Sequence, residues 1–304
     1  MSHVIGIDLG TTSVKSILID SAGTILAQST QDYPLAHPHP NWAEQNPEEW
    51  WMATCASIQD ILSQSNVPAM NITGIGFSGQ MHGAVFLDAN NNVLRPAILW
   101  CDTRAEAECR RVARHLPPDR VRELISNPIL PNFTASKVLW LRYNEPHHYN
   151  SIAKITLPKD YLRFKLTGEL IAEHSDASGT ALHEVAAWRW SESMLYALDI
   201  PTDWVPPLAA STDIVGTVSR QAAHETGLTA GTPVMAGCGD NAASALGTGV
   251  VKNGSAVSIL GTSGVVLANS DDHVLEPSAS IQTFCHAVSR LSLIHISEPT
   301  RPNE

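Results

Sequence analysis

Three short apolar runs open the chain and are separated by polar turns. They cover residues 4–9, 13–19 and 24–28, and the turns between them contain Gly10-Thr11-Thr12 and Asp20-Ser21-Ala22-Gly23. Short apolar runs bounded by glycine and small polar residues are typical of β-strands joined by tight turns. The pattern predicts an antiparallel meander of three strands at the start of a domain.

A helix is predicted to begin at Asn46-Pro47-Glu48-Glu49. This tetrapeptide offers a capping side chain, a proline for the first turn and two acids at the positive end of the helix. The residues that follow repeat at helical spacing and predict a buried face made of Trp50, Thr54, Ile58, Ile61 and Leu62.

The later part of the chain contains shorter apolar runs that are separated by polar segments. Strands are expected at 72–77, 84–87 and 154–157, and a helix at 161–166 ends at Gly168. The turn-forming stretch Leu228–Pro233 precedes a fresh apolar run and marks a domain boundary. We therefore expect a first domain at 1–230 and the start of a second at 231–288.

The last sixteen residues have no clear place in this alternation. The segment 289–304, which includes Leu293-Ile294-His295-Ile296-Ser297, resembles translated adapter or vector read-through. We expect it to be a non-native tail and leave it out of the fold prediction.

Composition narrows the class of protein. The 304 residues are 43% hydrophobic and 16% charged, with a formal net charge of -11. A chain this acidic repels nucleic acid unless its basic residues cluster, and they do not. The sequence shows no signal peptide and no apolar stretch long enough for a membrane helix, so a cytoplasmic protein is expected. The five scattered cysteines are expected to be reduced thiols.

One turn sequence occurs twice. Leu9-Gly10-Thr11-Thr12-Ser13-Val14 is echoed by Leu260-Gly261-Thr262-Ser263-Gly264-Val265, and each copy follows one strand-like run and precedes another. A glycine followed by hydroxyl residues lets backbone N–H groups converge on an anion such as phosphate. Either copy alone is also compatible with an ordinary hairpin turn, but the pairing indicates two related domains.

A carboxylate stands beside the first turn, and another follows a later strand. Asp8 ends the first strand, where it could hold Mg²⁺ against a polyphosphate. Asp240 lies in Gly237-Cys238-Gly239-Asp240-Asn241, before an alanine-rich helix. Asp240-Asn241 can be a helix N-cap, a catalytic pair, or both.

Other catalytic motifs are excluded. Gly74-x-Gly76-x-x-Gly79 fits the dinucleotide pattern, but it falls within a strand and its turn rather than between a strand and a helix. The chain has no P-loop, no His-Glu-x-x-His and no Gly-x-Ser-x-Gly motif. No structural zinc site is indicated, because the histidine pairs lack thiolate or carboxylate partners at ligand spacing.

Several motifs together resemble the FGGY family of carbohydrate kinases. They occur in the family's order from about Val4 to about Ala287, and comprise Asp8-Leu9-Gly10-Thr11-Thr12, Ser78-Gly79-Gln80-Met81-His82-Gly83, Pro96-Ala97-Ile98-Leu99-Trp100, Thr134–Leu141, Leu157–Arg163, Ser175–Thr180 and Gly239-Asp240-Asn241-Ala242-Ala243. The resemblance implies an α/β, two-domain ribonuclease H-like fold of the actin and hexokinase type. It also implies that this chain contains only part of the second domain.

The resemblance assigns roles to individual residues. It implies that Asp240 is the general base for the sugar hydroxyl and that Asp8 supports Mg²⁺. The sugar pocket would be lined by Met81, His82 and Asn241, with Asp102 and Arg104 nearby. ATP would be held by the two turns, through Thr11, Thr12, Gly261, Thr262 and Ser263.

The activity that the resemblance implies is ATP-dependent phosphorylation of a sugar. Ser78-Gly79-Gln80 before Met81-His82 favours D-xylulose, which would yield D-xylulose 5-phosphate. Cys101 stands where related kinases more often have an amide side chain, which leaves gluconate and other pentuloses as alternatives. A noncatalytic sugar-binding fragment and an actin-like or chaperone ATPase are further alternatives. By the same analogy a homodimer is expected, and the 304-residue chain alone is expected to be inactive.

Overall fold

The computed structural model describes residues 2–260, 264–275 and 281–297. Its strands are β1 His3–Leu9, β2 Ser13–Asp20, β3 Ile25–Asp32, β4 Glu44–Gln45, β5 Ile72–Gly79, β6 Val85–Leu87, β7 Ala97–Ile98, β8 Lys154–Thr156, β9 Ala172–Glu173, β10 His183–Glu184, β11 Arg189–Trp190, β12 Leu208–Ala209, β13 Ile214–Thr217, β14 Pro233–Met235, β15 Cys238–Gly239, β16 Ala256–Leu260, β17 Gly264–Ser270, β18 Gln282–Cys285 and β19 Ser292–Ser297.

Its α-helices are α1 Pro47–Ser65, α2 Glu106–His115, α3 Pro118–Ile125, α4 Thr134–Asn144, α5 Pro146–Asn150, α6 Pro158–Thr167, α7 His174–Ala177, α8 Glu192–Ala197, α9 Arg220–Thr226 and α10 Asp240–Gly247. Short 3-10 helices cover Ala69–Asn71, Ser178–Thr180, Val185–Ala187 and Thr202–Trp204. Within the described ranges, no helix has both the length and the apolar composition that a membrane span requires.

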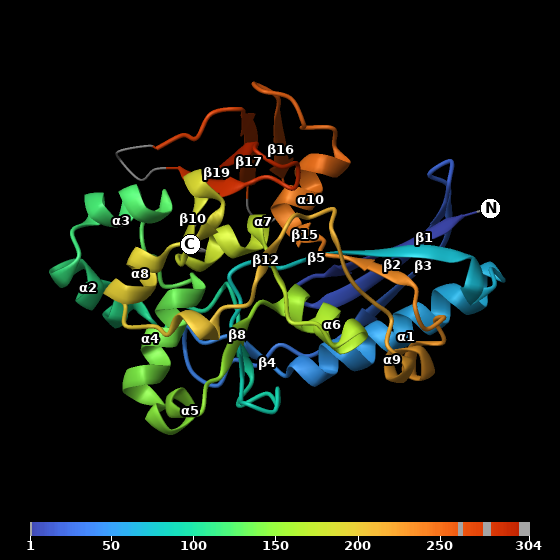
Figure 1. Ribbon diagram of the computed structural model, residues 1–304, viewed down its shortest axis with the longest axis horizontal. Helices are drawn as coiled ribbons and strands as arrows, with labels where there is room; N and C mark the ends of the chain where they lie inside the picture. Colours follow the sequence, from blue (N-terminus) through green and yellow to red (C-terminus); the bar gives the residue numbers. More distant parts are fainter. Residues whose placement is uncertain (1, 261–263, 276–280, 298–304) are drawn as a thin grey trace.

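A seven-stranded mixed sheet organises the first part of the molecule. Its order is β13-β14-β5-β1-β2-β3, and β15 also pairs with β5. The strands β1, β2 and β3 form the predicted antiparallel meander. β1, β14 and β15 all run parallel to β5, so their carboxyl ends meet at one edge of the sheet. Figure 1 shows this sheet with α1 and α9 alongside it.

The helix α1 begins where the sequence predicted. Asn46 is its N-cap and accepts a hydrogen bond from the N–H of Glu48, and Pro47 occupies the first turn. Trp50, Thr54, Ile58 and Ile61 are buried, which confirms four of the five predicted positions, and Leu62 is partly buried against the same cluster. This face joins the apolar side chains of β1, β2 and β5 in one hydrophobic cluster.

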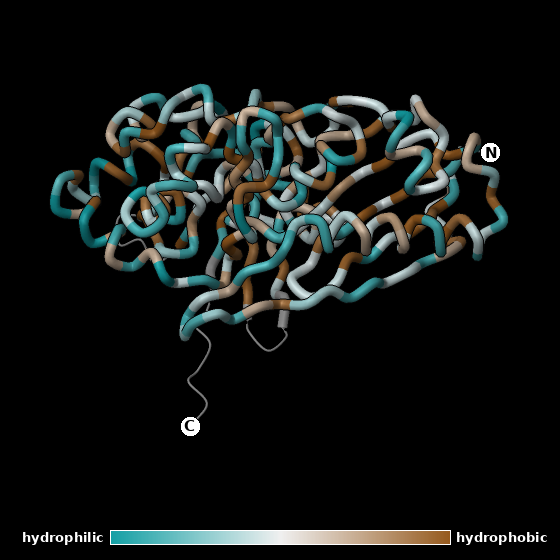
Figure 2. Tube along the Cα trace, turned by 90° about the horizontal axis from the view of Figure 1, so that it is seen from below, coloured by the Kyte–Doolittle hydropathy of each residue, from teal (hydrophilic) through white to brown (hydrophobic). Residues whose placement is uncertain are grey.

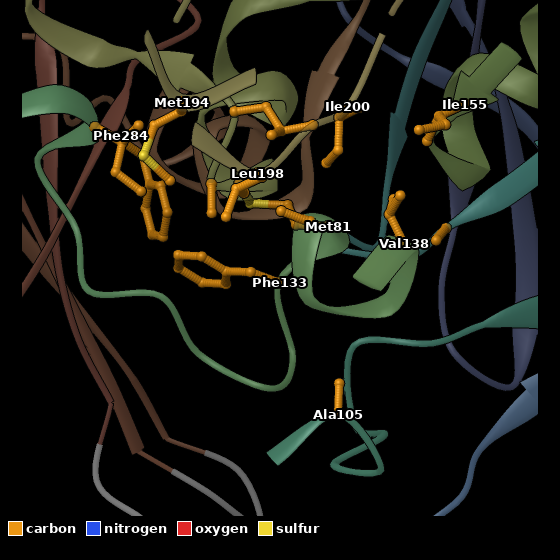
Figure 3. Close-up of a cluster of buried hydrophobic side chains, with 14 of the residues drawn as sticks. Met81, Ala105, Phe133, Val138, Ile155, Met194, Leu198, Ile200 and Phe284 are labelled. Carbon is orange, nitrogen blue, oxygen red and sulfur yellow. The ribbon is translucent and has the colours of Figure 1, made fainter. Parts of the chain in front are cut away.

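A second hydrophobic cluster lies around α3, α4, α8 and the residues after β5. Figure 3 shows Met81, Phe133, Met194 and Phe284 converging in it from different parts of the chain. Burial of each such aromatic, leucine or methionine side chain contributes on the order of 1.5–3 kcal/mol to the stability of the fold. Figure 2 shows the same arrangement in hydropathy, with apolar segments in the interior and polar loops at the periphery.

A separate four-stranded sheet, of order β16-β17-β19-β18, lies next to α10 (Figure 1). β16 and β17 flank the second copy of the repeated sequence, and they pair antiparallel as β1 and β2 do. β19 lies within the expected non-native tail and pairs with both β17 and β18. The sequence prediction gave this segment no structural place, whereas its alternating apolar residues suit a strand. Its origin stays a prediction.

Three predictions of detail need adjustment. β3 extends to Asp32, beyond the predicted end at residue 28. β6 pairs with β8 rather than with the sheet of β5, so the two predicted strands around the turn 78–83 belong to different sheets. β14 and β15 follow the expected boundary at residue 230 but pair with β5, so the first sheet extends to Gly239. The division into domains at that boundary stays a prediction.

Candidate active site

The two candidate acids lie at the same edge of the central sheet. The parallel register aligns Asp8 of β1 with Ser78 of β5, and Ser78 in turn with Cys238 of β15. Ser78 donates a hydrogen bond from its hydroxyl to Oδ1 of Asp8. Asp240 follows β15 directly, so β5 lies between the strands that carry the two acids. Residues more than 230 positions apart in the sequence thus meet at the carboxyl ends of parallel strands.

Asp240 is the first residue of α10 and is half-buried. Its Oδ1 accepts a hydrogen bond from the N–H of Asn241 at 2.7 Å. Burial, helped by the charge of Asp8 and opposed by the N–H of Asn241, raises the pKa of this carboxyl to about 7. A carboxyl that titrates near neutral pH is suited to accept a proton from a hydroxyl group.

The interpretation of Asp240 as a helix N-cap is wrong. The N-cap of α10 is Gly239, which makes no side-chain capping bond, and Asp240 lies one position inside the helix. Its carboxylate is at the positive end of the helix, where a negative charge is favoured. Asp240 therefore does not cap α10.

The carbonyl groups of the first repeated turn accept hydrogen bonds from neighbouring side chains. Gly10 O accepts hydrogen bonds from the Tyr33 hydroxyl at 2.6 Å and from Gln80 Nε2 at 3.2 Å, and Thr11 O accepts one from Gln45 Nε2 at 2.7 Å. The N–H groups of Thr11 and Thr12 have no acceptor among the residues that the structure describes. The carbonyl groups of the turn are therefore hydrogen-bonded within the protein, and the N–H groups of Thr11 and Thr12 remain as donors for a phosphate.

Met81 and Asn241 approach each other next to the base. Met81 is buried, and its sulfur lies 3.8 Å from Nδ2 of Asn241. A side chain at Gly239 would come within 2.8 Å of Met81, so the glycine before the base permits this contact. The structure therefore brings two of the three predicted sugar-pocket residues together at Asp240.

His82 is more constrained than the sequence suggested. The ring is buried, stacks on Phe133 with a centroid distance of 4.7 Å, and donates from Nδ1 to Gly179 O at 2.7 Å. Burial lowers the pKa of His82 to about 3, so the ring is neutral near pH 7. Since Nδ1 donates, Nε2 is the remaining polar atom and can only accept a hydrogen bond.

Asp102 and Arg104 form a buried pair. Arg104 donates to both oxygens of Asp102, and Asp102 Oδ2 also accepts from the N–H of Ala43 at 2.7 Å. The guanidinium of Arg104 lies 3.7 Å from the ring centroid of Trp42 and forms an ion pair with Glu44. Both side chains thus bind the segment 42–44. These contacts indicate that Asp102 and Arg104 stabilise this segment and do not contact the sugar.

The predicted phosphate residues Gly261, Thr262 and Ser263 lie outside the described residues. Sequence reasoning did not single out Ser78 or Trp100 as site residues, although both lie in motifs used for the family resemblance. Trp100 is 43% exposed and donates from Nε1 to Thr11 Oγ1 at 2.9 Å. The alignment of Ser78 with Asp8 could be found only from the register of β1 and β5.

The residues at this edge fit Mg²⁺ and a nucleotide phosphate. Asp8 is an exposed carboxylate beside the free N–H groups of the first turn. Within the described part of the chain, no three acids, histidines or cysteines are grouped as a metal cluster. Mg²⁺ in phosphoryl-transfer sites is commonly held by one or two carboxylates together with substrate phosphates, so a single acid is sufficient.

Comparison with protein families matches residues 3–247 to the N-terminal domain of the FGGY family of carbohydrate kinases. The chain belongs to this family. The α/β fold expected from the resemblance is confirmed as well. A crystal structure from Brucella ovis, described as a xyloylose kinase, superposes with a TM-score of 0.92 at 39% identity, covering 97% of this chain and 60% of that one.

Two curated relatives bear on the substrate. The xylulose kinase of Escherichia coli (strain K12) is 43% identical over 284 residues, which is 93% of this chain and 58% of that protein. The gluconokinase of Bacillus subtilis (strain 168) is 30% identical over 288 residues, which is 95% of this chain and 55% of that protein. The chain thus spans less than two thirds of the length of the curated relatives it matches.

Proposed function

We propose that this chain forms the sugar site and part of the phosphate site of an ATP-dependent xylulokinase, which converts D-xylulose to D-xylulose 5-phosphate. The observation that carries the proposal is Asp240, a carboxyl with a pKa raised to about 7 at a strand edge shared with Asp8, Met81 and Asn241. Phosphoryl transfer depends mainly on positioning and charge stabilisation, so one base and a phosphate site are sufficient.

Each residue has a defined part in the reaction. Asp240 accepts the proton of the terminal hydroxyl of the sugar as O5 bonds to the γ-phosphorus and the bond to the bridging oxygen of ADP breaks. Thr11 and Thr12 donate backbone N–H groups to the phosphates. Asp8 would hold Mg²⁺, which neutralises phosphate charge when bound. A matching role for Gly261, Thr262 and Ser263 stays a prediction.

The charges around the sugar pocket favour a neutral sugar over gluconate. The proposed sugar site contains the carboxyl of Asp240, the carboxyl of Asp8 lies at the same sheet edge, and His82 is neutral near pH 7. The two cations beside His82 and Trp42 are bound, since Lys137 donates to His82 O and Asn132 O, and Arg104 pairs with Asp102. An acid substrate needs a free cation to offset its desolvation. The greater identity to the relative named as a xylulose kinase supports the same choice.

The test separates sugar binding from catalysis. Calorimetric titration of the 304-residue chain with D-xylulose, D-ribulose and gluconate is expected to give the highest affinity for D-xylulose. The complete gene product is expected to release ADP in proportion to D-xylulose, and Asp240→Asn to reduce that rate by about 10² to 10⁴ while sugar still binds. Full activity of the Asp240→Asn variant would refute the assignment of the base.

The same experiments distinguish the remaining alternatives. Preferred phosphorylation of gluconate or another pentulose would redefine the substrate within the family. Sugar binding without ADP release from the complete gene product would favour a noncatalytic sugar-binding protein, and stimulation by peptides an ATPase of the chaperone type. The homodimer and the cytoplasmic location expected from the sequence stay predictions.

A further inference from the structure

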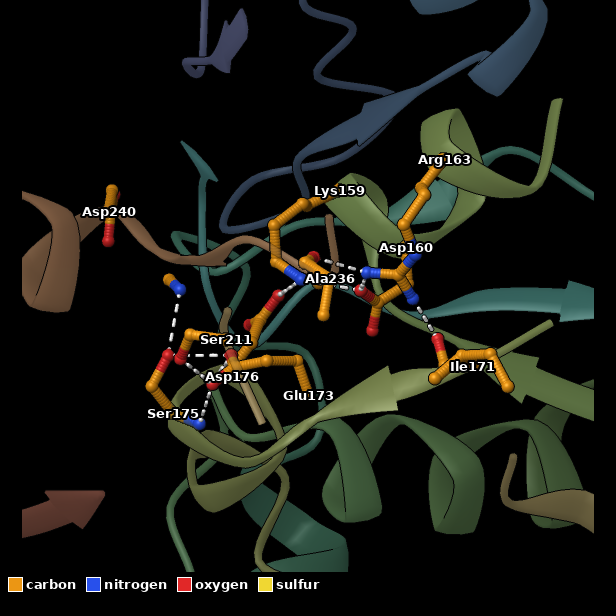
Figure 4. Close-up of polar contacts among 12 residues, drawn as sticks. Lys159, Asp160, Arg163, Ile171, Glu173, Ser175, Asp176, Ser211, Ala236 and Asp240 are labelled. Carbon is orange, nitrogen blue, oxygen red and sulfur yellow. Dashed lines mark hydrogen bonds and ion pairs between the residues drawn. The ribbon is translucent and has the colours of Figure 1, made fainter. Parts of the chain in front are cut away.

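A buried polar chain reaches the backbone immediately before the base. The N–H of Gly239 donates to the hydroxyl of Ser175 at 3.0 Å, and that hydroxyl donates to Oε2 of Glu173 at 2.7 Å (Figure 4). The direction of these bonds is fixed, because a backbone N–H can only donate and a carboxylate can only accept. Ser175 and Glu173 lie more than sixty residues before Asp240 in the sequence.

Glu173 is itself firmly held. Its carboxylate is fully buried and also accepts bonds from the N–H of Ser175 at 2.9 Å, the N–H of Asp176 at 3.2 Å and the hydroxyl of Ser211 at 2.6 Å. Hydrogen bonds to an ionised carboxylate are about twice as strong as those between neutral groups. Glu173 therefore forms a rigid anchor, and Ser175 links the anchor to Gly239.

Two more contacts restrict the same backbone segment. Arg163 donates from Nη1 to Ala236 O and pairs with Asp160, next to Lys159 (Figure 4). The N–H of Gly237 donates to Ser211 O at 3.0 Å. The segment 236–239, which leads to Asp240, is thus hydrogen-bonded at Ala236, Gly237 and Gly239.

We propose that Glu173 and Ser175 are positioning residues, which fix the carboxylate of Asp240 by hydrogen bonding to the backbone one residue before it. The inference rests on the proposed role of Asp240 as the base. Both residues act through the backbone N–H of Gly239, so they are positioning residues and not catalytic ones. Their effect arises because a base must be held within a fraction of an ångström of the reacting hydroxyl.

A purely structural role of Glu173 and Ser175 would affect stability without changing the titration of Asp240. Breaking the link leaves the buried N–H of Gly239 without its acceptor, which lowers stability in either case. A positioning role also changes the surroundings of Asp240, whose charged neighbours in the described part of the chain include Asp8 from β1 and Asp176 from α7. When the segment loosens, the carboxyl gains water, and its titration moves down from about 7 towards 3.8.

The test uses the 304-residue chain, with carbon-labelled aspartate and amide hydrogen exchange followed by NMR. Ser175→Ala is expected to speed exchange of the Gly239 amide at least tenfold and to lower the titration midpoint of Asp240. Ser175→Thr keeps the hydroxyl and is expected to restore both. The matched control is Ser57→Ala, a fully buried serine of α1 that is bonded to Ser16 and lies in the other hydrophobic region.

The outcomes are decisive in both directions. Unchanged exchange at Gly239 and unchanged titration of Asp240 in folded Ser175→Ala overturn the proposal, as does an equal change in Ser57→Ala. If Ser175→Ala does not fold, Glu173→Gln tests the same link through its second member. These readouts need no kinase activity, so they separate a failure of this inference from a failure of the proposed function.

Discussion

Replacing Asp240 by asparagine is expected to stabilise the fold while it slows the proposed reaction by about 10² to 10⁴. The amide keeps Oδ1 as an acceptor for the N–H of Asn241 and removes the half-buried charge. Folding raises the pKa of Asp240 from its ordinary value of 3.8 to about 7. At 1.36 kcal/mol per pKa unit, ionising this carboxyl in the folded state costs about 4 kcal/mol, which is an upper limit because the side chain is partly solvated.

The sign of the pH dependence follows from that shift. The folded state binds the proton more tightly than the unfolded chain, so the destabilisation begins above pH 3.8 and is complete above about pH 7. Relative to the wild type, Asp240→Asn should gain up to about 1.6 kcal/mol at pH 5 and about 2–4 kcal/mol at pH 8. Urea unfolding followed by tryptophan fluorescence at both pH values measures the difference.

The matched control is Asp203→Asn, which changes an exposed aspartate to the same amide. It should alter stability by less than about 0.5 kcal/mol at either pH. The reasoning is refuted if Asp240→Asn is no more stable than the wild type at pH 8, or if its gain is the same at pH 5 and pH 8.

Two further variants test the surroundings of the base by the same unfolding assay. Burial raises the pKa of Asp176 well above its ordinary value, so Asp176→Asn should gain stability over the wild type as the pH rises from 5 to 8; a gain that falls with pH would contradict this. Gly237→Ala should lose more than about 2 kcal/mol, because its added carbon meets Phe77 O. Gly23→Ala, with φ of 83° and open space around it, should lose only about 1 kcal/mol; equal losses would remove the steric argument.

Local patterns predicted the elements that depend on neighbouring residues. The meander of β1, β2 and β3 follows from short apolar runs and glycine turns, and α1 from the capping sequence at Asn46. The α/β class and the family were also predicted correctly, because the motifs occur together and in order. These features need no knowledge of which distant segments pair.

Features that depend on distant pairing could not be predicted. β15 has two residues, too few to show a strand pattern, and it is identified only by its pairing with β5. The contact of Ser78 with Asp8 depends on strand register, and the bond from Gly239 to Ser175 joins segments 64 residues apart. His82 was expected to line the sugar pocket; the structure adds that stacking on Phe133 and the bond to Gly179 leave its ring one acceptor atom, Nε2.

Different groups around Asp240 fix its backbone and contact its carboxylate. The backbone before the base is bound through Ala236 O and the N–H of Gly239, by groups that lie behind the site. The carboxylate itself accepts a bond at Oδ1 from Asn241, and within the described part of the chain Oδ2 has no donor. A second donor on Oδ2 would lower the pKa of the carboxyl and make it a weaker base. Anchoring the backbone therefore gives Asp240 a fixed position, while one oxygen remains for the hydroxyl of a sugar.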